Sequence, residues 1–155
     1  AKIIAADVTE EKLLEAKNCG ADVTLRSDAP EFVQQVRQTA NDGDGPSVAI
    51  ETAGIPGALE EIVKVVCNAG RIITLGFSEK PGKISELQIT SRELDIRGSR
   101  LQNHLFPQVI QAVSENKVCL DGMISHRFHF TQVKEAFALA DQKDPSVKKI
   151  VLLFD

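Results

Sequence analysis

The feature that most constrains the fold is a repeated alternation of short apolar runs with segments of helical periodicity. The apolar runs lie at residues 3–6, 23–25, 47–50 and 71–75. Each of the first three is followed by a segment with apolar side chains at helical spacing, and Gly20 and Pro30 mark the end of the first helix and the start of the second. This alternation predicts an α/β fold with a doubly wound parallel sheet.

The pattern changes after Gly76. We expect a strand at residues 94–97, a helix at 105–115, a strand or loop at 123–128, a helix at 133–140 and a final strand at 148–154. A chain of 155 residues has room for one domain, or for one domain and part of a second.

Composition and charge exclude several classes of partner. The 18 basic and 22 acidic residues give a net charge of −4, which argues against a nucleic-acid surface. The apolar run at residues 150–154 is far shorter than the roughly 18 residues of a membrane-spanning helix, so no membrane partner is expected. The three cysteines are widely separated and form no disulfide framework or zinc knuckle. A reducing, cytoplasmic location fits this cysteine usage best.

Asp7 is an acid at the carboxyl end of the first predicted strand. In a dinucleotide-binding sheet an acid at this place hydrogen-bonds the adenosine ribose hydroxyls, although acids there also serve as ordinary helix caps. The ribose acid follows the first glycine of a GxGxxG loop by about 20 residues, which here would fall upstream of Ala1. None of the 10 glycines lies in such a pattern. We therefore expect the first strand and the glycine-rich loop of the sheet to be absent from this chain.

Further short motifs carry a family resemblance. They lie at residues 16–22, 50–54, 70–76, 93–100, 106–107, 124–128 and 134–137. In this order and spacing the chain resembles the zinc-dependent medium-chain dehydrogenase family over nearly its whole length. Gly98-Ser99-Arg100, followed by Asn103 and Phe106-Pro107, looks most like the polyol and sugar-acid branch, such as sorbitol or L-gulonate and L-galactonate 5-dehydrogenases.

The resemblance implies a Rossmann-type sheet that binds NAD. The family's ribose acid falls on Asp7 and its basic residue near the adenosine on Lys12. Asp7 is followed by Val8 and not by arginine, which favours NAD over NADP because a 2′-phosphate would meet a carboxylate. Nicotinamide-side backbone contacts fall at three strand ends, and a phosphate contact falls on the last strand. These positions are Thr52, Ala53, Gly54, Leu75, Gly76, Phe77, Gly98, Ser99, Arg100 and Lys149.

The zinc ligands of the resembling family are not found in this sequence. In that family cysteine, histidine and an acid of the amino-terminal domain hold a catalytic zinc, which acts as a Lewis acid on the substrate oxygen. We therefore expect no catalytic and no metal-binding residue in this chain, and zinc only in the missing amino-terminal domain. His126 and His129, three positions apart on a strand, would face opposite sides and are expected to be structural.

The remaining histidine and the cysteines have ordinary interpretations. Two interpretations of His104 remain: it contacts the substrate near the cleft, or it is an exposed loop residue. Cys67 lies on an apolar helical stripe and is expected in the core. Cys19 and Cys119 are expected to be thiols without a special role.

The expected function follows from the resemblance. Residues 1–101 would be a partial NAD-binding domain, and residues 102–155 a helix and strand returning toward the catalytic domain. The intact protein would transfer hydride between a polyol or sugar acid and NAD, and would form a homo-oligomer through the sheet edge near residues 94–97. By itself this chain is expected to be inactive. The alternatives are a zinc-free quinone or enoyl reductase of the same superfamily, and a non-catalytic nucleotide-binding or oligomerisation module.

The expected strand order has a physical consequence. If it is 3-2-1-4-5-6, the missing first strand lies between residues 3–6 and residues 48–50. Backbone groups facing that position would lack hydrogen-bond partners. We expect the isolated chain to be marginally stable, or to fill the position by rearrangement or with a strand from a neighbour.

Overall fold

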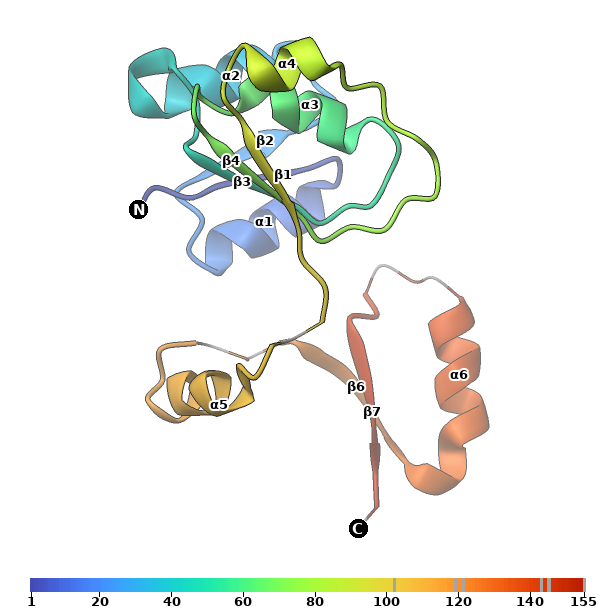
Figure 1. Cartoon of the computed structure of the whole chain (residues 1–155). Coiled ribbons are helices and arrows are strands. Elements are labelled where there is room, and N and C mark those ends of the chain that lie inside the picture. The colour runs from blue at the N-terminus through green and yellow to red at the C-terminus, as the bar shows by residue number, and fades with distance from the viewer. Residues whose placement is uncertain (102, 119, 121, 143, 145, 155) are drawn as a thin grey trace. The chain divides into compact units, whose positions relative to one another are not determined.

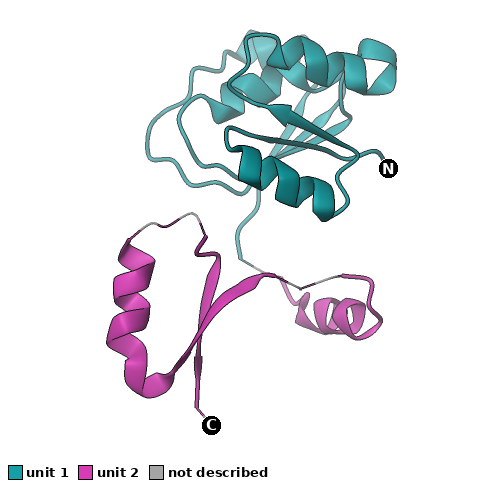
Figure 2. Cartoon of the chain, turned by 180° about the vertical axis from the view of Figure 1, so that it is seen from behind, with its two compact units in different colours: residues 1–101 teal, residues 102–155 magenta. Residues whose placement is uncertain are grey.

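The computed structural model describes residues 1–101, 103–118, 120, 122–142, 144 and 146–154. The chain divides into two compact units, residues 1–101 and 102–155 (Figures 1 and 2). The elements of the first unit are β1 (Ile4–Asp7), α1 (Glu10–Asn18), β2 (Val23–Arg26), α2 (Phe32–Thr39), β3 (Val48–Glu51), α3 (Ala58–Val65), β4 (Arg71–Thr74), α4 (Glu86–Thr90) and β5 (Asp95–Gly98). Those of the second are α5 (Phe106–Ser114), β6 (Ile124–His129), α6 (Val133–Asp141) and β7 (Lys149–Leu153).

Every strand pair is parallel. β1 pairs with β2, β4 lies between β3 and β5, and β6 pairs with β7. In the first unit α2, α3 and α4 lie over one face of the strands and α1 lies over the other (Figure 1). The predicted α/β class with parallel, doubly wound strands is confirmed, and most predicted strands differ from the observed ones by one or two residues.

The strands of the first unit form two separate sheets. Within residues 1–101, all of which the structure describes, β1 has only β2 as a strand neighbour and β3 has only β4. Val48 and Ile50 of β3 are 50% and 55% exposed. β1 and β3 therefore each keep one unpaired side, as predicted for residues 3–6 and 48–50.

The core of the first unit lies between the α2–α3 layer and β4. Ile72 of β4 and Val66 after α3 are fully buried, and Val63 of α3 is 1% exposed. Phe32 and Val36 of α2 complete the contact from the neighbouring helix. This packing holds the carboxyl ends of β3 and β4 in fixed register, with Glu51 opposite Thr74.

The second unit is built on the parallel β6–β7 pair. α6 contacts both strands and buries Ala136. α5 has no buried residue, and its Phe106 and Ile110 are 62% and 66% exposed. Among the described residues, every helix is too short or too polar to cross a membrane.

Candidate functional site

The predicted nicotinamide-side residues gather at the carboxyl ends of three neighbouring strands. Residues 52–54 follow β3, residues 75–77 follow β4, and residues 98–100 end and follow β5. The parallel register places Glu51 opposite Thr74 and Thr74 opposite Gly98. This edge of an open α/β sheet is where such folds bind ligands.

Two glycines let the loops after β3 and β4 touch backbone to backbone. Gly54 has a φ of +61°, and a Cβ there would lie 2.7 Å from the amide nitrogen of Phe77. A Cβ on Gly76 would collide with the amide nitrogen of Gly54. Any larger residue at either position would push the loops apart.

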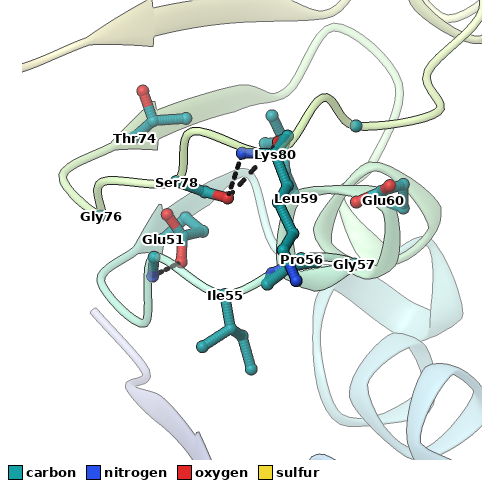
Figure 3. A pocket seen from close by; sticks show the side chains of 12 residues that line it. Glu51, Ile55, Pro56, Gly57, Leu59, Glu60, Thr74, Gly76, Ser78 and Lys80 are labelled. Carbon is teal, nitrogen blue, oxygen red and sulfur yellow. Dashed lines mark hydrogen bonds between the residues drawn. The ribbon is translucent and has the colours of Figure 1, made fainter.

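Glu51 joins the same two loops. Its carboxylate Oε1 accepts a hydrogen bond from the Gly54 amide at 2.7 Å. Its main-chain oxygen accepts from the amides of Leu75 and Gly76 at 2.8 and 3.1 Å. The side chain is buried and borders a cavity of about 280 Å³ beside the first turn of α3 (Figure 3). Sequence reasoning missed Glu51, although an acid that ends the apolar run Val48-Ala49-Ile50 was a usable signal.

The loops after β4 and β5 are linked by an aromatic contact. The guanidinium carbon of Arg100 lies 5.0 Å from the centre of the Phe77 ring. The ring is otherwise open to solvent, since Phe77 is 70% exposed. A cation is attracted to an aromatic face at this distance, so this contact stabilises the approach of the loops after β4 and β5.

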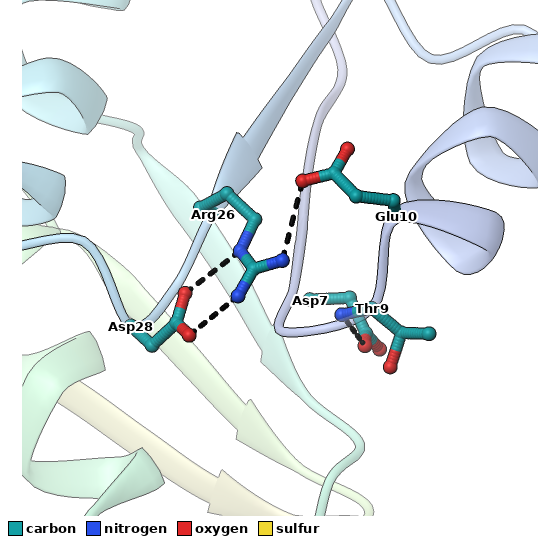
Figure 4. Close-up of polar contacts among 5 residues, drawn as sticks. All are labelled: Asp7, Thr9, Glu10, Arg26 and Asp28. Atoms are coloured by element: carbon teal, nitrogen blue, oxygen red, sulfur yellow. Dashed lines mark hydrogen bonds and ion pairs between the residues drawn. The ribbon is translucent and has the colours of Figure 1, made fainter.

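Asp7 lies at the end of β1, with its carboxylate partly exposed. Oδ1 accepts a hydrogen bond from the Thr9 amide at 2.9 Å (Figure 4). Oδ2 lies 3.9 Å from the Lys12 ammonium. The carboxylate therefore supports the turn into α1 with one oxygen and leaves the other beside a basic residue. The predicted pair Asp7 and Lys12 is brought together.

Arg26 ends β2 beside Asp7 and is held by two acids. Its Nε and Nη2 donate to the two oxygens of Asp28 at 2.8 and 2.6 Å, and its Nη1 donates to Glu10 at 3.2 Å (Figure 4). The hydrogen bonds from Arg26 lower the pKa of the Asp28 carboxyl, and Asp28 in turn raises the pKa of Arg26. Sequence reasoning missed this cluster, which joins the end of β2 to the turn that follows it and to the first turn of α1.

The other predicted residues belong to the second unit. Lys149 begins β7 in the second unit, and its phosphate contact stays a prediction. His126 and His129 contact the hydroxyls of Ser125 and Thr131 at 3.0 and 2.7 Å. Within the part of the chain that the structure describes, no group of three or more metal-ligating side chains comes together.

The remaining histidine and the cysteines are not among the residues of the strand-end loops. His104 is exposed and has a φ of 55°. Cys67 is buried, as predicted, but it follows α3, which ends at Val65, and so does not lie on the helix. Cys19 is exposed. Cys119 lies outside the described residues.

Comparisons with known proteins identify the family of this chain. Residues 1–115 match the family described as zinc-binding dehydrogenase. The starvation-sensing protein RspB of Escherichia coli K12 is 32% identical over 152 residues, which is 98% of this chain and 44% of RspB. Sorbitol dehydrogenase of Bombyx mori is 31% identical over 155 residues, which is 97% of this chain and 43% of that protein.

A solved structure of a related enzyme has a similar fold. The rspB alcohol dehydrogenase of E. coli CFT073, complexed with NADH, has a TM-score of 0.88 and 31% identity, over 99% of this chain and 44% of that one. The chain thus spans less than half the length of the relatives that it matches. This chain therefore has the same Rossmann-type fold as the part of that NADH-bound structure which it matches.

Proposed function

Because the chain belongs to the zinc-binding dehydrogenase family, we propose that it is the carboxyl-terminal, NAD-binding portion of a dehydrogenase that acts on a polyol or sugar acid. Residues 1–101 form part of the coenzyme domain, and residues 102–155 lead back toward a catalytic domain. The observation that carries this proposal is the backbone contact between the loops after β3 and β4, at Gly54 and Gly76. The relative of 31% identity that was solved with NADH supports it.

The residues present fit a nicotinamide coenzyme at the strand ends. The glycines at positions 54 and 76 allow the loops after β3 and β4 to lie backbone against backbone at the strand ends, where a Cβ would push them apart. The exposed edge of the Asp7 carboxylate is suited to accept hydrogen bonds from ribose hydroxyls. When bound, NAD supplies the hydride acceptor for an alcohol carbon. The chain's own residues bind and orient it: Asp7 at the adenosine half, and the loops after β3, β4 and β5 at the nicotinamide half.

Charge around Asp7 favours NAD over NADP in this proposal. Asp7, Glu10 and Asp28 place three carboxylates about the ends of β1 and β2. Two basic groups lie beside these acids: Lys12, next to Asp7, and Arg26, which already binds Asp28 and Glu10. A 2′-phosphate would therefore meet net negative charge.

The catalytic zinc of the proposed enzyme belongs to another part of the protein. Within the described residues no set of side chains fits a zinc ion, so no step is assigned to this chain through the metal. A zinc-free quinone or enoyl reductase is the second candidate. The 31% identity to a sorbitol dehydrogenase favours the polyol enzyme. We also propose a homo-oligomer formed through β5, which is the edge of its sheet.

The decisive experiment uses the protein at its natural length. It measures NADH and NADPH binding by fluorescence, zinc by elemental analysis, and NAD reduction with a panel of polyols and sugar acids. Tight NADH binding, bound zinc and turnover of a polyol are expected. Quinone or enoyl reduction without zinc would support the second candidate. Binding of nucleotide without any turnover would leave a non-catalytic module, and no binding of NADH would refute the proposal.

A further inference from the structure

Glu51 is the one charged side chain that is buried among the residues the structure describes, and it is 6% exposed. No ion pair found among those residues includes it. Burying a carboxyl group costs free energy unless hydrogen bonds replace its hydration. The groups that hydrogen-bond to Glu51 in place of water therefore indicate its role.

The hydrogen bonds of Glu51 lead to the two loops that meet at Gly54 and Gly76. The carboxylate accepts from the Gly54 amide, and the main-chain oxygen accepts from the Leu75 and Gly76 amides. The second carboxylate oxygen faces Gly76, since a Cβ built there would lie 2.5 Å from Oε2. One residue thus fixes the distance between the loops after β3 and β4.

The same residue belongs to a different sheet from the adenosine half of the proposed site. Asp7 lies on β1, which pairs only with β2, whereas Glu51 ends β3 in the other sheet of the first unit. Within this unit, a change at Glu51 alters the loops after β3 and β4 without breaking any hydrogen bond of Asp7. The two halves of a bound dinucleotide should therefore respond differently.

We propose that Glu51 is a positioning residue for the nicotinamide half of the coenzyme, acting through Gly54 and Gly76. This role rests on the proposed function. The carboxylate holds the Gly54 amide and so keeps the backbone of both loops in the arrangement that receives the nicotinamide. This role requires that residue 51 carry a hydrogen-bond acceptor at the position of Oε1. Glutamine keeps this acceptor, and alanine lacks it.

The test compares two ligands on the protein at its natural length. NADH occupies both halves of the site, and ADP-ribose lacks the nicotinamide. E51A should raise the dissociation constant of NADH about tenfold, and that of ADP-ribose less than about twofold. E51Q should stay within about threefold of the unsubstituted protein for both ligands, because its amide oxygen can accept from Gly54.

Two further variants keep the test decisive. E60A is the matched control, because Glu60 borders the same cavity and accepts from the Lys83 amide at 2.9 Å, outside the two loops. It should leave the ratio of the two dissociation constants unchanged. G76A is the second probe and remains informative if E51A does not fold. Its methyl group would enter the space of Gly54 and of the Glu51 carboxylate, so it should also weaken NADH selectively.

The outcomes separate the two proposals. Equal weakening of NADH and ADP-ribose by E51A and G76A would overturn the positioning role, as would an E51Q variant as weak as E51A. Unchanged NADH binding by E51A would overturn the role alone and leave the proposed function standing. If the unsubstituted protein binds neither ligand, the proposed function fails, and the role of Glu51 fails with it.

Discussion

Asp7 and Arg26 are opposite each other at the ends of β1 and β2, yet the ion pairs of Arg26 go to Asp28 and Glu10. Asp7 instead has Lys12 as its basic neighbour, at 3.9 Å. The acid that we assign to the ribose is thus not covered by the arginine beside it. This arrangement leads to two of the predictions below.

Removing the Asp7 carboxylate should weaken coenzyme binding. D7A should raise the dissociation constant of NADH on the order of 10- to 100-fold, because hydrogen bonds between ribose hydroxyls and a charged acceptor are lost. Fluorescence titration measures it. E11Q, which removes one carboxylate from an exposed position of α1, is the control and should change binding little. An equal effect of both variants would point to overall charge and not to a ribose contact.

Releasing Arg26 should alter the preference between the two coenzymes. D28A removes the acid that binds Arg26 at two points, and the freed guanidinium should improve NADPH affinity about two- to fivefold. The double variant R26A/D28A should lose that gain. A gain that persists without Arg26 would show that the arginine is not its source.

Acid should remove the contribution of Asp95 to stability. Hydrogen bonds from Arg97 and then Arg71 hold the pKa of Asp95 below its ordinary value. Its pKa in the folded chain is therefore lower than in the unfolded chain, where it is about 3.9. The stabilisation is present above that unfolded value and is lost as the pH falls through the folded pKa.

Urea unfolding at several pH values tests this contribution. The difference in free energy of unfolding between the unsubstituted protein and D95N should be greatest near neutral pH and should shrink below about pH 4. A difference that does not change with pH would mean that the ion pairs with Arg71 and Arg97 do not contribute to stability.

Truncating Ile72 should destabilise the first unit strongly. Its side chain is fully buried between β4 and the helices, so I72A should lower the free energy of unfolding by about 2–5 kcal/mol. L14A, on the 64% exposed Leu14 of α1, is the control and should change it by less than about 0.5 kcal/mol. Similar losses in the two variants would contradict the assigned core.

The regular part of the fold could be predicted from the sequence, because strand and helix periods, Gly20 and Pro30 are local signals. They located β1 to β4 closely. The family resemblance singled out residues 52–54 and 75–77, which the parallel arrangement of β3 and β4 brings to one edge. The pairing of Arg26 with Asp28 and of Glu51 with Gly54 could not be predicted, although these partners lie only two and three residues apart, because it depends on the backbone geometry of the turns after β2 and β3. The hydrogen bond between Arg26 and Glu10 joins residues 16 positions apart. The roles of Asp7, Lys12, Lys149 and the strand-end loops in coenzyme binding stay predictions.

The missing pairing between β1 and β3 affects how the first unit unfolds locally. No strand hydrogen bond joins the two sheets, and α2 contacts both β2 and α3. The segment from β1 to β2 could therefore detach without breaking any backbone hydrogen bond within β3, β4 and β5. Hydrogen exchange of the isolated chain should then resolve two cooperative units, with the amides of β1 and β2 exchanging at lower free energy than those of β4.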